Sequence, residues 1–220
     1  MISVNDLALS DKIKRGLAED GYIILKDLVL PIDTDLNSYI EKTFSSDNRD
    51  FGSGQMCYFY KGGAVDKVYD YLEGIVVNVL GRLDEKYAKE VIGSTHSCVQ
   101  LTRYPKLSDS KKGTTALAEH TDPSLLTILT SGSRDGLFLK GHVSGWKEIK
   151  LDQGSAVVFT GTGLEKLSAG EYKGCVHKVV NTFDQKVRYA CQFFPFPASG
   201  FNVPFVDESQ ESYAYYGEPL

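Results

Sequence analysis

Residues 119–130 read EHTDPSLLTILT, in which a histidine and an aspartate two positions apart precede an apolar run rich in Leu, Ile and Thr. Similar β-rich runs lie on both sides of it, and turn signals such as RDG and DQG separate them. Many short strands at regular spacing are typical of an all-β sandwich or barrel. The predicted strands are CVQLTRY (98–104), LLTILT (125–130), GLFLK (136–140), KEIKL (147–151), SAVVFTG (155–161), VHKVVN (176–181) and VRYACQFF (187–194).

The first third of the chain has a different pattern. Apolar residues such as Ile13 and Leu17 recur at spacings near three, four or seven with charges between them, which indicates helices. The run GYIILKDLVLP (21–31) interrupts this pattern and predicts a strand. The clearest helix is predicted by one continuous apolar stripe from Val65 to Tyr87.

These patterns together predict one domain over residues 1–220, of the α+β class but mainly β. Its core is a double-stranded β-helix, or jelly roll, over residues 92–200. The helical N-terminal part, residues 1–91, packs against that core. A Tyr-rich tail follows at 201–220.

The composition excludes several classes of protein. The chain has 24 Lys and Arg against 29 Asp and Glu, a net charge of −5, and no basic run, so neither a nucleic-acid nor a membrane partner is expected. No apolar stretch approaches the ~18–20 residues of a spanning helix, and the first residues lack a signal-peptide run. We therefore expect a cytoplasmic protein. Its four cysteines form no CxxC pair and are predicted to be free thiols.

Three residues suggest a metal site. If the segment around His120 is extended, His120 and Asp122 point to the same face, and His177 lies in a later predicted strand. Two imidazoles and one carboxylate on one side of a metal leave the opposite positions open, as in non-heme Fe(II) oxygenases. A lone His-x-Asp also occurs by chance at a surface turn, so the neighbouring sequence has to decide.

The order and spacing of the neighbouring sequence segments favour the metal site. From about Val99 to Phe196 the chain resembles the iron- and 2-oxoglutarate-dependent dioxygenase superfamily, in the branch that contains isopenicillin N synthase and the plant dioxygenases. The resemblance implies that His120, Asp122 and His177 bind Fe(II). It also implies that Arg188, 11 positions after His177, and Tyr104 hold the distal carboxylate of 2-oxoglutarate. A guanidinium suits that task because it offers a bidentate fork to a carboxylate and stays charged.

The chain departs from the family pattern at two positions near this cosubstrate. Ala190 stands where the family usually has Ser, and Thr102 replaces the Asn of the family's Asn-x-Tyr element, keeping a hydroxyl at the cosubstrate site. An iron oxidase of the isopenicillin N synthase type, which works without 2-oxoglutarate, therefore stays open as an alternative. Retention of Arg188 and Tyr104 favours 2-oxoglutarate.

Strand parity extends the predicted site. If Arg188 points inward, alternation places every second residue of its strand on the same face and sends Cys191 to the other. The aromatic group at residues 58–60 falls in the segment that helps to wall the substrate pocket in the family. The candidate substrate contacts, for which core packing is the alternative, are Gln100, Gln192, Phe194, Tyr58, Phe59 and Tyr60.

The expected activity follows from the resemblance. It implies an oxygenase that uses Fe(II), 2-oxoglutarate and O2 to hydroxylate, desaturate or cyclise a small soluble metabolite, releasing succinate and CO2. The alternatives are the 2-oxoglutarate-independent oxidase and a non-catalytic binding protein on the same scaffold.

Overall fold

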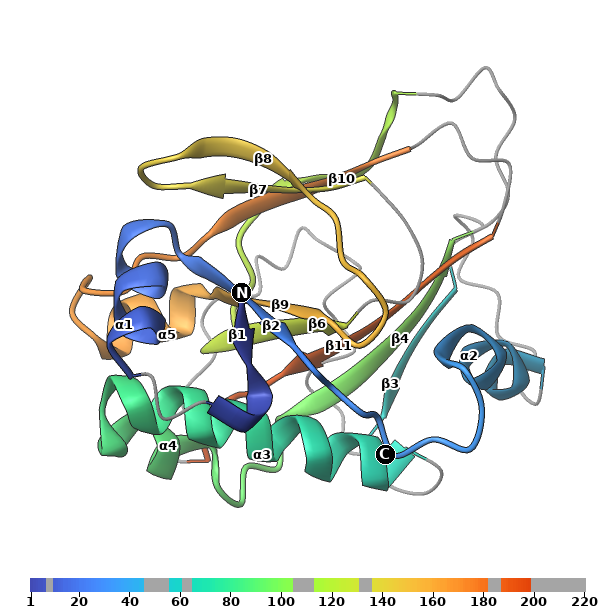
Figure 1. Ribbon diagram of the computed structural model, residues 1–220, viewed down its shortest axis with the longest axis horizontal. Helices are drawn as coiled ribbons and strands as arrows, with labels where there is room; N and C mark the ends of the chain where they lie inside the picture. Colours follow the sequence, from blue (N-terminus) through green and yellow to red (C-terminus); the bar gives the residue numbers. More distant parts are fainter. Residues whose placement is uncertain are drawn as a thin grey trace.

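The computed structural model describes residues 1–6, 10–45, 56–60, 65–104, 113–130, 136–181 and 187–198. In these residues two β-sheets face each other, and helices cover the outer side of the larger sheet (Figure 1). The major sheet has the strand order β1-β2-β9-β6-β11-β4-β3, and the minor sheet has the order β5-β10-β7-β8. This arrangement confirms the α+β jelly-roll class. The predicted tail at 201–220 lies outside the described residues.

The strands of the major sheet are β1 (Ile2–Ser3), β2 (Tyr22–Lys26), β3 (Met56–Tyr60), β4 (Cys98–Tyr104), β6 (Leu126–Thr130), β9 (Ala156–Thr160) and β11 (Arg188–Phe194). Those of the minor sheet are β5 (Thr115–His120), β7 (Leu137–Gly141), β8 (Gly145–Ile149) and β10 (Val176–Val180). The helices are the 3-10 turn η1 (Val4–Asp6), α1 (Ser10–Glu19), α2 (Leu36–Ser45), α3 (Asp66–Leu83), α4 (Glu85–Val91) and α5 (Thr162–Leu167).

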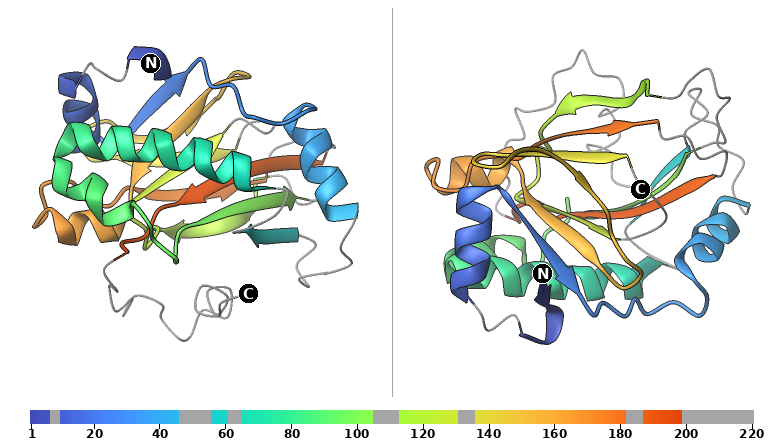
Figure 2. Two further views of the ribbon diagram at one scale, coloured as in Figure 1. Left: turned by 90° about the horizontal axis from the view of Figure 1, so that it is seen from below. Right: turned by 45° about the horizontal axis from the view of Figure 1, so that its top comes forward.

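Alternation along each strand divides the major sheet into two faces. Leu126 and Ile128 of β6 pack in the core beneath the helices, whereas Leu129 of the same strand packs against the core between the sheets. On β9, Val158 likewise packs in the core beneath the helices and Phe159 in the core between the sheets. We call these two sides the helix face and the inner face. Figure 2 shows α3 lying across the helix face, with α1 and α4 at one end and α2 at the other.

The helix predicted from Val65 to Tyr87 is in fact two helices. Asp84, between α3 and α4, has an extended backbone with φ −161° and ψ 137°. Its backbone N–H donates to Leu80 at the end of α3, and its side chain accepts from the backbone N–H of Lys86 at the start of α4. The apolar stripe continues because Tyr87 is also buried, so periodicity alone does not reveal the break.

Two further differences concern strands. Residues 56–60, for which the sequence patterns predict no strand, form β3 at the edge of the major sheet and pair with β4. Residues 115–120 form β5, although every residue of this strand is exposed or only half-buried. A strand exposed on both faces lacks the alternation by which a strand is predicted. None of the helices in the described parts of the chain combines the length and the apolar character that crossing a membrane requires.

Candidate metal centre

The two predicted histidine ligands come from neighbouring strands of the minor sheet. His120 ends β5, His177 lies near the start of β10, and the two are directly paired in the antiparallel register. Directly opposite residues point to the same side of a sheet, and the two ring centroids are accordingly 4.1 Å apart. The sheet register therefore brings together imidazoles that are 57 positions apart in the chain.

Asp122 completes the group. Its Oδ1 lies 3.5 Å from Nε2 of His120 and 3.7 Å from Nε2 of His177. The three ligand atoms lie within 4.8 Å of one another. Asp122 and His177 are buried, and His120 is half-buried at the rim. Two imidazole nitrogens and one carboxylate oxygen on one side of a common point fit an Fe(II) ion whose remaining positions stay open.

Asp122 reaches this position without belonging to a strand. β5 ends at His120, so the expected sharing of one strand face does not hold for Asp122. A turn places it instead, because its backbone carbonyl accepts from the backbone N–H of Thr162 at 2.8 Å. Gly161 makes this close approach possible, since a Cβ there would collide with the backbone oxygen of Ser124.

The carboxylate of Asp122 is also oriented by a side chain that sequence reasoning missed. Thr127 on β6 donates its hydroxyl to Oδ2 at 2.5 Å, which leaves Oδ1 facing the two histidines. Thr127 is buried on the inner face, between apolar neighbours. A buried threonine inside the run LLTILT was the available signal, because a buried hydroxyl requires a hydrogen-bond partner.

Backbone carbonyls orient both imidazoles. Nδ1 of His120 lies 2.8 Å from the carbonyl oxygen of Ala118, and Nδ1 of His177 lies 3.4 Å from that of Cys175. A proton on Nδ1 donates to these oxygens and leaves the Nε2 lone pair for a metal. The ring of Phe159 packs on His177 with the centroids 4.7 Å apart. Each histidine is thus held in the tautomer and orientation that a metal ligand needs.

The charges of the three residues are strongly coupled. Burial by itself raises the pKa of Asp122, but its electrostatic interactions with His177 and His120 and the hydrogen bond from Thr127 together hold this pKa below its ordinary value. Burial lowers the pKa of His177 and outweighs the opposing effect of Asp122. Burial also acts to lower the pKa of His120, but the hydrogen bond and charge of Asp122 raise it. An ionised carboxylate beside a neutral His177 suits a divalent cation.

The predicted cosubstrate residues lie together at one end of the β4–β11 ladder. Arg188 and Tyr104 are directly paired, and the guanidinium carbon lies 4.3 Å from the centre of the Tyr104 ring. Nη1 of Arg188 is also 3.5 Å from the carbonyl oxygen of Val180 on β10. Arg188 therefore reaches from the major sheet to the minor sheet. Val180 is three residues from His177, roughly 10 Å along an extended strand.

A chain of polar side chains continues from this pair along the same ladder. Ala190 is paired with Thr102, and Gln192 with Gln100. The amide nitrogen of Gln100 donates to the hydroxyl of Thr102 at 3.0 Å, and this hydroxyl lies 3.3 Å from Oε1 of Gln192. The structure thus brings three of the predicted residues into one hydrogen-bonded group.

The remaining candidates divide into two sets. Phe194 is buried and paired with Cys98. Tyr58, Phe59 and Tyr60 form part of β3 and pair with Leu101, Gln100 and Val99, but their side chains lie outside the description. The two histidines without a predicted role, His96 and His142, are both exposed.

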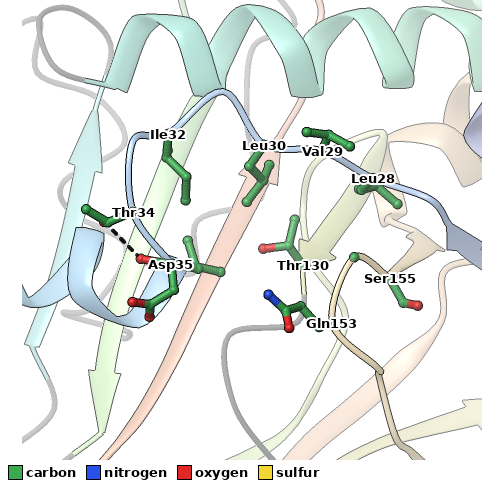
Figure 3. A pocket seen from close by; sticks show the side chains of 11 residues that line it. Leu28, Val29, Leu30, Ile32, Thr34, Asp35, Thr130, Gln153 and Ser155 are labelled. Atoms are coloured by element: carbon green, nitrogen blue, oxygen red, sulfur yellow. Dashed lines mark hydrogen bonds between the residues drawn. The ribbon is translucent and has the colours of Figure 1, made fainter.

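A separate pocket of about 270 Å³ lies on the helix face. Its wall includes Thr130, which follows Leu126 and Ile128 in the alternation of β6 and therefore faces away from Asp122. Figure 3 shows the segment that carries Leu30 and Ile32 along one side of it and Gln153 with Ser155 along another. Among the predicted site residues whose side chains the structure describes, none lines this pocket.

Comparisons with known proteins agree with this geometry. Residues 95–197 match the family model described as the 2OG-Fe(II) oxygenase superfamily. The Arabidopsis thaliana protein named "Probable 2-oxoglutarate-dependent dioxygenase AOP1" is 32% identical over 130 residues, which are 56% of this chain and 42% of that protein. Gibberellin 2-beta-dioxygenase 3 of A. thaliana is 29% identical over 115 residues, which are 51% of this chain and 34% of that protein. The chain thus spans less than half the length of these relatives.

Two solved structures share the fold over most of both chains. A full-length Neurospora crassa protein, solved in complex with alpha-KG and 5-formyluracil, superposes with a TM-score of 0.72 at 19% identity, covering 89% of this chain and 83% of that one. AtDAO1, the dioxygenase for auxin oxidation 1 of A. thaliana, was solved as its 2-oxoglutarate complex. It superposes with a TM-score of 0.70 at 16% identity, covering 89% of this chain and 91% of that one.

Proposed function

We propose that the chain, whose residues 95–197 match the model of the 2OG-Fe(II) oxygenase superfamily, acts as an Fe(II)- and 2-oxoglutarate-dependent oxygenase of a small molecule. The observation that carries the proposal is the convergence of His120, Asp122 and His177 on one point from two strands and a turn. Bound Fe(II), with 2-oxoglutarate and O2, would supply the oxidation of a substrate C–H bond coupled to release of succinate and CO2.

The protein's own part is to bind and to orient. His120, Asp122 and His177 would hold the iron from one side and leave the other side for the cosubstrate and O2. Thr127 keeps one oxygen of Asp122 engaged, so that the carboxylate offers the other oxygen to the iron. This arrangement supports a fixed open coordination geometry at the inner face.

Arg188 supports 2-oxoglutarate as the cosubstrate. Its guanidinium lies against Tyr104 and near Val180, three residues along β10 from His177. A dicarboxylate bound to the iron at one end would present its other carboxylate towards this guanidinium, which can accept it in a bidentate pair. Thr102, directly opposite Ala190, offers a hydroxyl at the rung where Ala190 has none. We assign Arg188, Tyr104 and Thr102 to the 2-oxoglutarate site.

The substrate contacts are proposed from the same face. Gln100 and Gln192 form one hydrogen-bonded group with Thr102, next to the proposed cosubstrate site. Phe194, two residues beyond Gln192, offers an apolar contact. We propose that these side chains surround a small molecule that has both polar and apolar groups. Of the aromatic positions 58–60 of β3, only Phe59 is paired with an inner-face residue, Gln100, and we keep it in this set; Tyr58 and Tyr60 are paired with Leu101 and Val99 of the helix face.

The test is anaerobic binding followed by turnover. The Fe(II)-loaded protein is titrated with 2-oxoglutarate and the charge-transfer absorption of the chelate is recorded; O2 is then admitted and succinate is measured. We expect saturable binding and succinate formation that needs both Fe(II) and O2. Arg188→Ala should weaken 2-oxoglutarate binding about tenfold or more, whereas Arg82→Ala on α3 serves as the matched control.

The alternatives make different predictions in this experiment. Absence of 2-oxoglutarate binding by the iron-loaded wild type would refute the proposal. O2 consumption with a reductant but without 2-oxoglutarate would indicate an oxidase of the isopenicillin N synthase type. Lack of any Fe(II) affinity would instead favour a binding protein on the same scaffold.

A further inference from the structure

A charged contact on the helix face joins α2 to the two strands that carry the proposed cosubstrate residues. Oε2 of Glu41 accepts a hydrogen bond from Nε of Arg103 at 2.9 Å and another from the hydroxyl of Tyr189 at 2.8 Å. Arg103 lies on β4 and Tyr189 on β11. One carboxylate oxygen of α2 therefore bridges two strands of the major sheet.

The bridge lies directly behind the proposed cosubstrate site. Tyr189 is the cross-strand partner of Arg103, and the adjacent rung pairs Arg188 with Tyr104. Neighbouring residues of a strand point to opposite faces. The side chains held by Glu41 are thus on the helix face, one rung from the two that we assign to 2-oxoglutarate on the inner face.

The pair of Arg188 with Tyr104 is the last rung of the β4–β11 ladder. β4 ends at Tyr104, and β11 begins at Arg188. Terminal backbone pairs open more readily than interior ones, and any opening would change the 4.3 Å stacking of Arg188 on Tyr104. A contact that links both strands at the penultimate rung opposes this opening.

We propose that Glu41 is a positioning residue for the 2-oxoglutarate site: by bridging Arg103 and Tyr189 it holds Arg188 and Tyr104 at the spacing that the distal carboxylate requires. The inference rests on the proposed function and adds to it a residue from the N-terminal third. Burial, the hydrogen bond to Glu41 and the charge of Glu41 raise the pKa of Tyr189. The phenol therefore stays protonated and able to donate at neutral pH.

The experiment compares Glu41→Ala and Glu41→Gln with Lys42→Ala, an exposed position on the same helix. Each Fe(II)-loaded protein is titrated anaerobically with 2-oxoglutarate, and its metal dissociation constant is measured separately. We expect Glu41→Ala to raise the dissociation constant of 2-oxoglutarate about three- to tenfold and to leave that of the metal within about twofold. Glu41→Gln keeps an acceptor oxygen and should restore most of the affinity, while Lys42→Ala should match the wild type.

A second variant keeps the inference falsifiable if Glu41→Ala folds poorly. Tyr189→Phe removes one hydrogen bond of the bridge and keeps the ring. It should raise the dissociation constant of 2-oxoglutarate about two- to fivefold. The effects of Tyr189→Phe and Glu41→Ala on the 2-oxoglutarate dissociation constant should not add, because both act through one bridge. Wild-type-like 2-oxoglutarate binding by Glu41→Ala and Tyr189→Phe would overturn the inference. So would a loss of metal affinity in these variants as large as their loss of 2-oxoglutarate affinity. Absence of binding by the wild type itself would instead overturn the proposed function.

Discussion

The helix face and the inner face of the major sheet are built from the same strands but carry different kinds of side chain. On the helix face, Leu101, Ile128 and Phe193 pack into an apolar core with α3. On the inner face, the residues next to them are Thr102, Thr127 and Gln192, all buried and all hydrogen-bonded. Alternation by single residues thus separates a face that stabilises the fold from a face that holds polar groups in place.

The inner face is itself divided. Val157 and Phe159 of β9 pack with Leu139 and Val179 of the minor sheet into a second apolar cluster, and the polar group lies on β4 and β11. His177 lies at the border, with the ring of Phe159 against it. The apolar cluster thus lets the two sheets stay packed while one side of the space between them is polar. The following substitutions test this separation.

Phe193→Ala tests the helix face and should have the largest effect. Phe193 is fully buried and meets the ring of Tyr69 edge-on at 5.1 Å. The loss of its buried area and the cavity left behind should lower the free energy of unfolding by about 3–5 kcal/mol, as measured by denaturant titration. Metal affinity of the folded protein should stay the same. A variant that kept its stability but lost the metal would contradict the separation.

His177→Ala tests the inner face. Removal of one of three ligands should weaken metal binding by at least roughly a hundredfold, because even changes outside the ligand set cost 10–100-fold. Calorimetric titration with Mn²⁺ as a redox-stable substitute measures this directly. His142→Ala, at an exposed histidine, is the control and should bind like the wild type. Equal losses in both variants would show that His177 is not a ligand.

Thr127→Val and Thr130→Val compare the two faces within β6. The hydroxyl of Thr127 donates to Asp122, and that of Thr130 to the carbonyl of Cys191 on the helix face. Thr127→Val should weaken metal binding about tenfold. Thr130→Val should leave metal binding unchanged and lower the stability by about 1 kcal/mol. The same pair of titrations, metal and denaturant, measures both, and a reversed pattern would count against the assignment of faces.

Ala190→Ser should have the smallest effect. It adds a hydroxyl opposite Thr102, beside the proposed carboxylate site, and should tighten 2-oxoglutarate binding by about two- to fivefold. Ala156→Ser places the same group in the helix-face core, where Ala156 is fully buried. That control should cost about 1–3 kcal/mol of stability without changing 2-oxoglutarate affinity. Weaker binding by Ala190→Ser would argue against a carboxylate at this rung.

Sequence patterns predicted most of the strands that contain buried residues, because burial imposes alternation or an apolar run; the two-residue β1 and the edge strand β3 were not predicted. The patterns also missed β5, which has no buried residue, and they joined α3 to α4, because the apolar stripe continues past Asp84. At the site, the family resemblance pointed to His120, Asp122 and His177, whose ligand atoms the structure brings within 4.8 Å of one another. The sequence did not identify Thr127 or Glu41, whose partners belong to other elements.

The sequence by itself determined the residue types of the metal group and the face on which each residue of β4 and β11 lies, since donor chemistry and strand parity are local properties. Only the tertiary structure decided that the register of β5 with β10 places His120 opposite His177. It also decided that a turn places the carboxylate of Asp122 beside both imidazoles. It also decided that α2 reaches Arg103 and Tyr189 from behind the ladder. Distances between separate elements depend on how their apolar faces pack, and no local pattern encodes them.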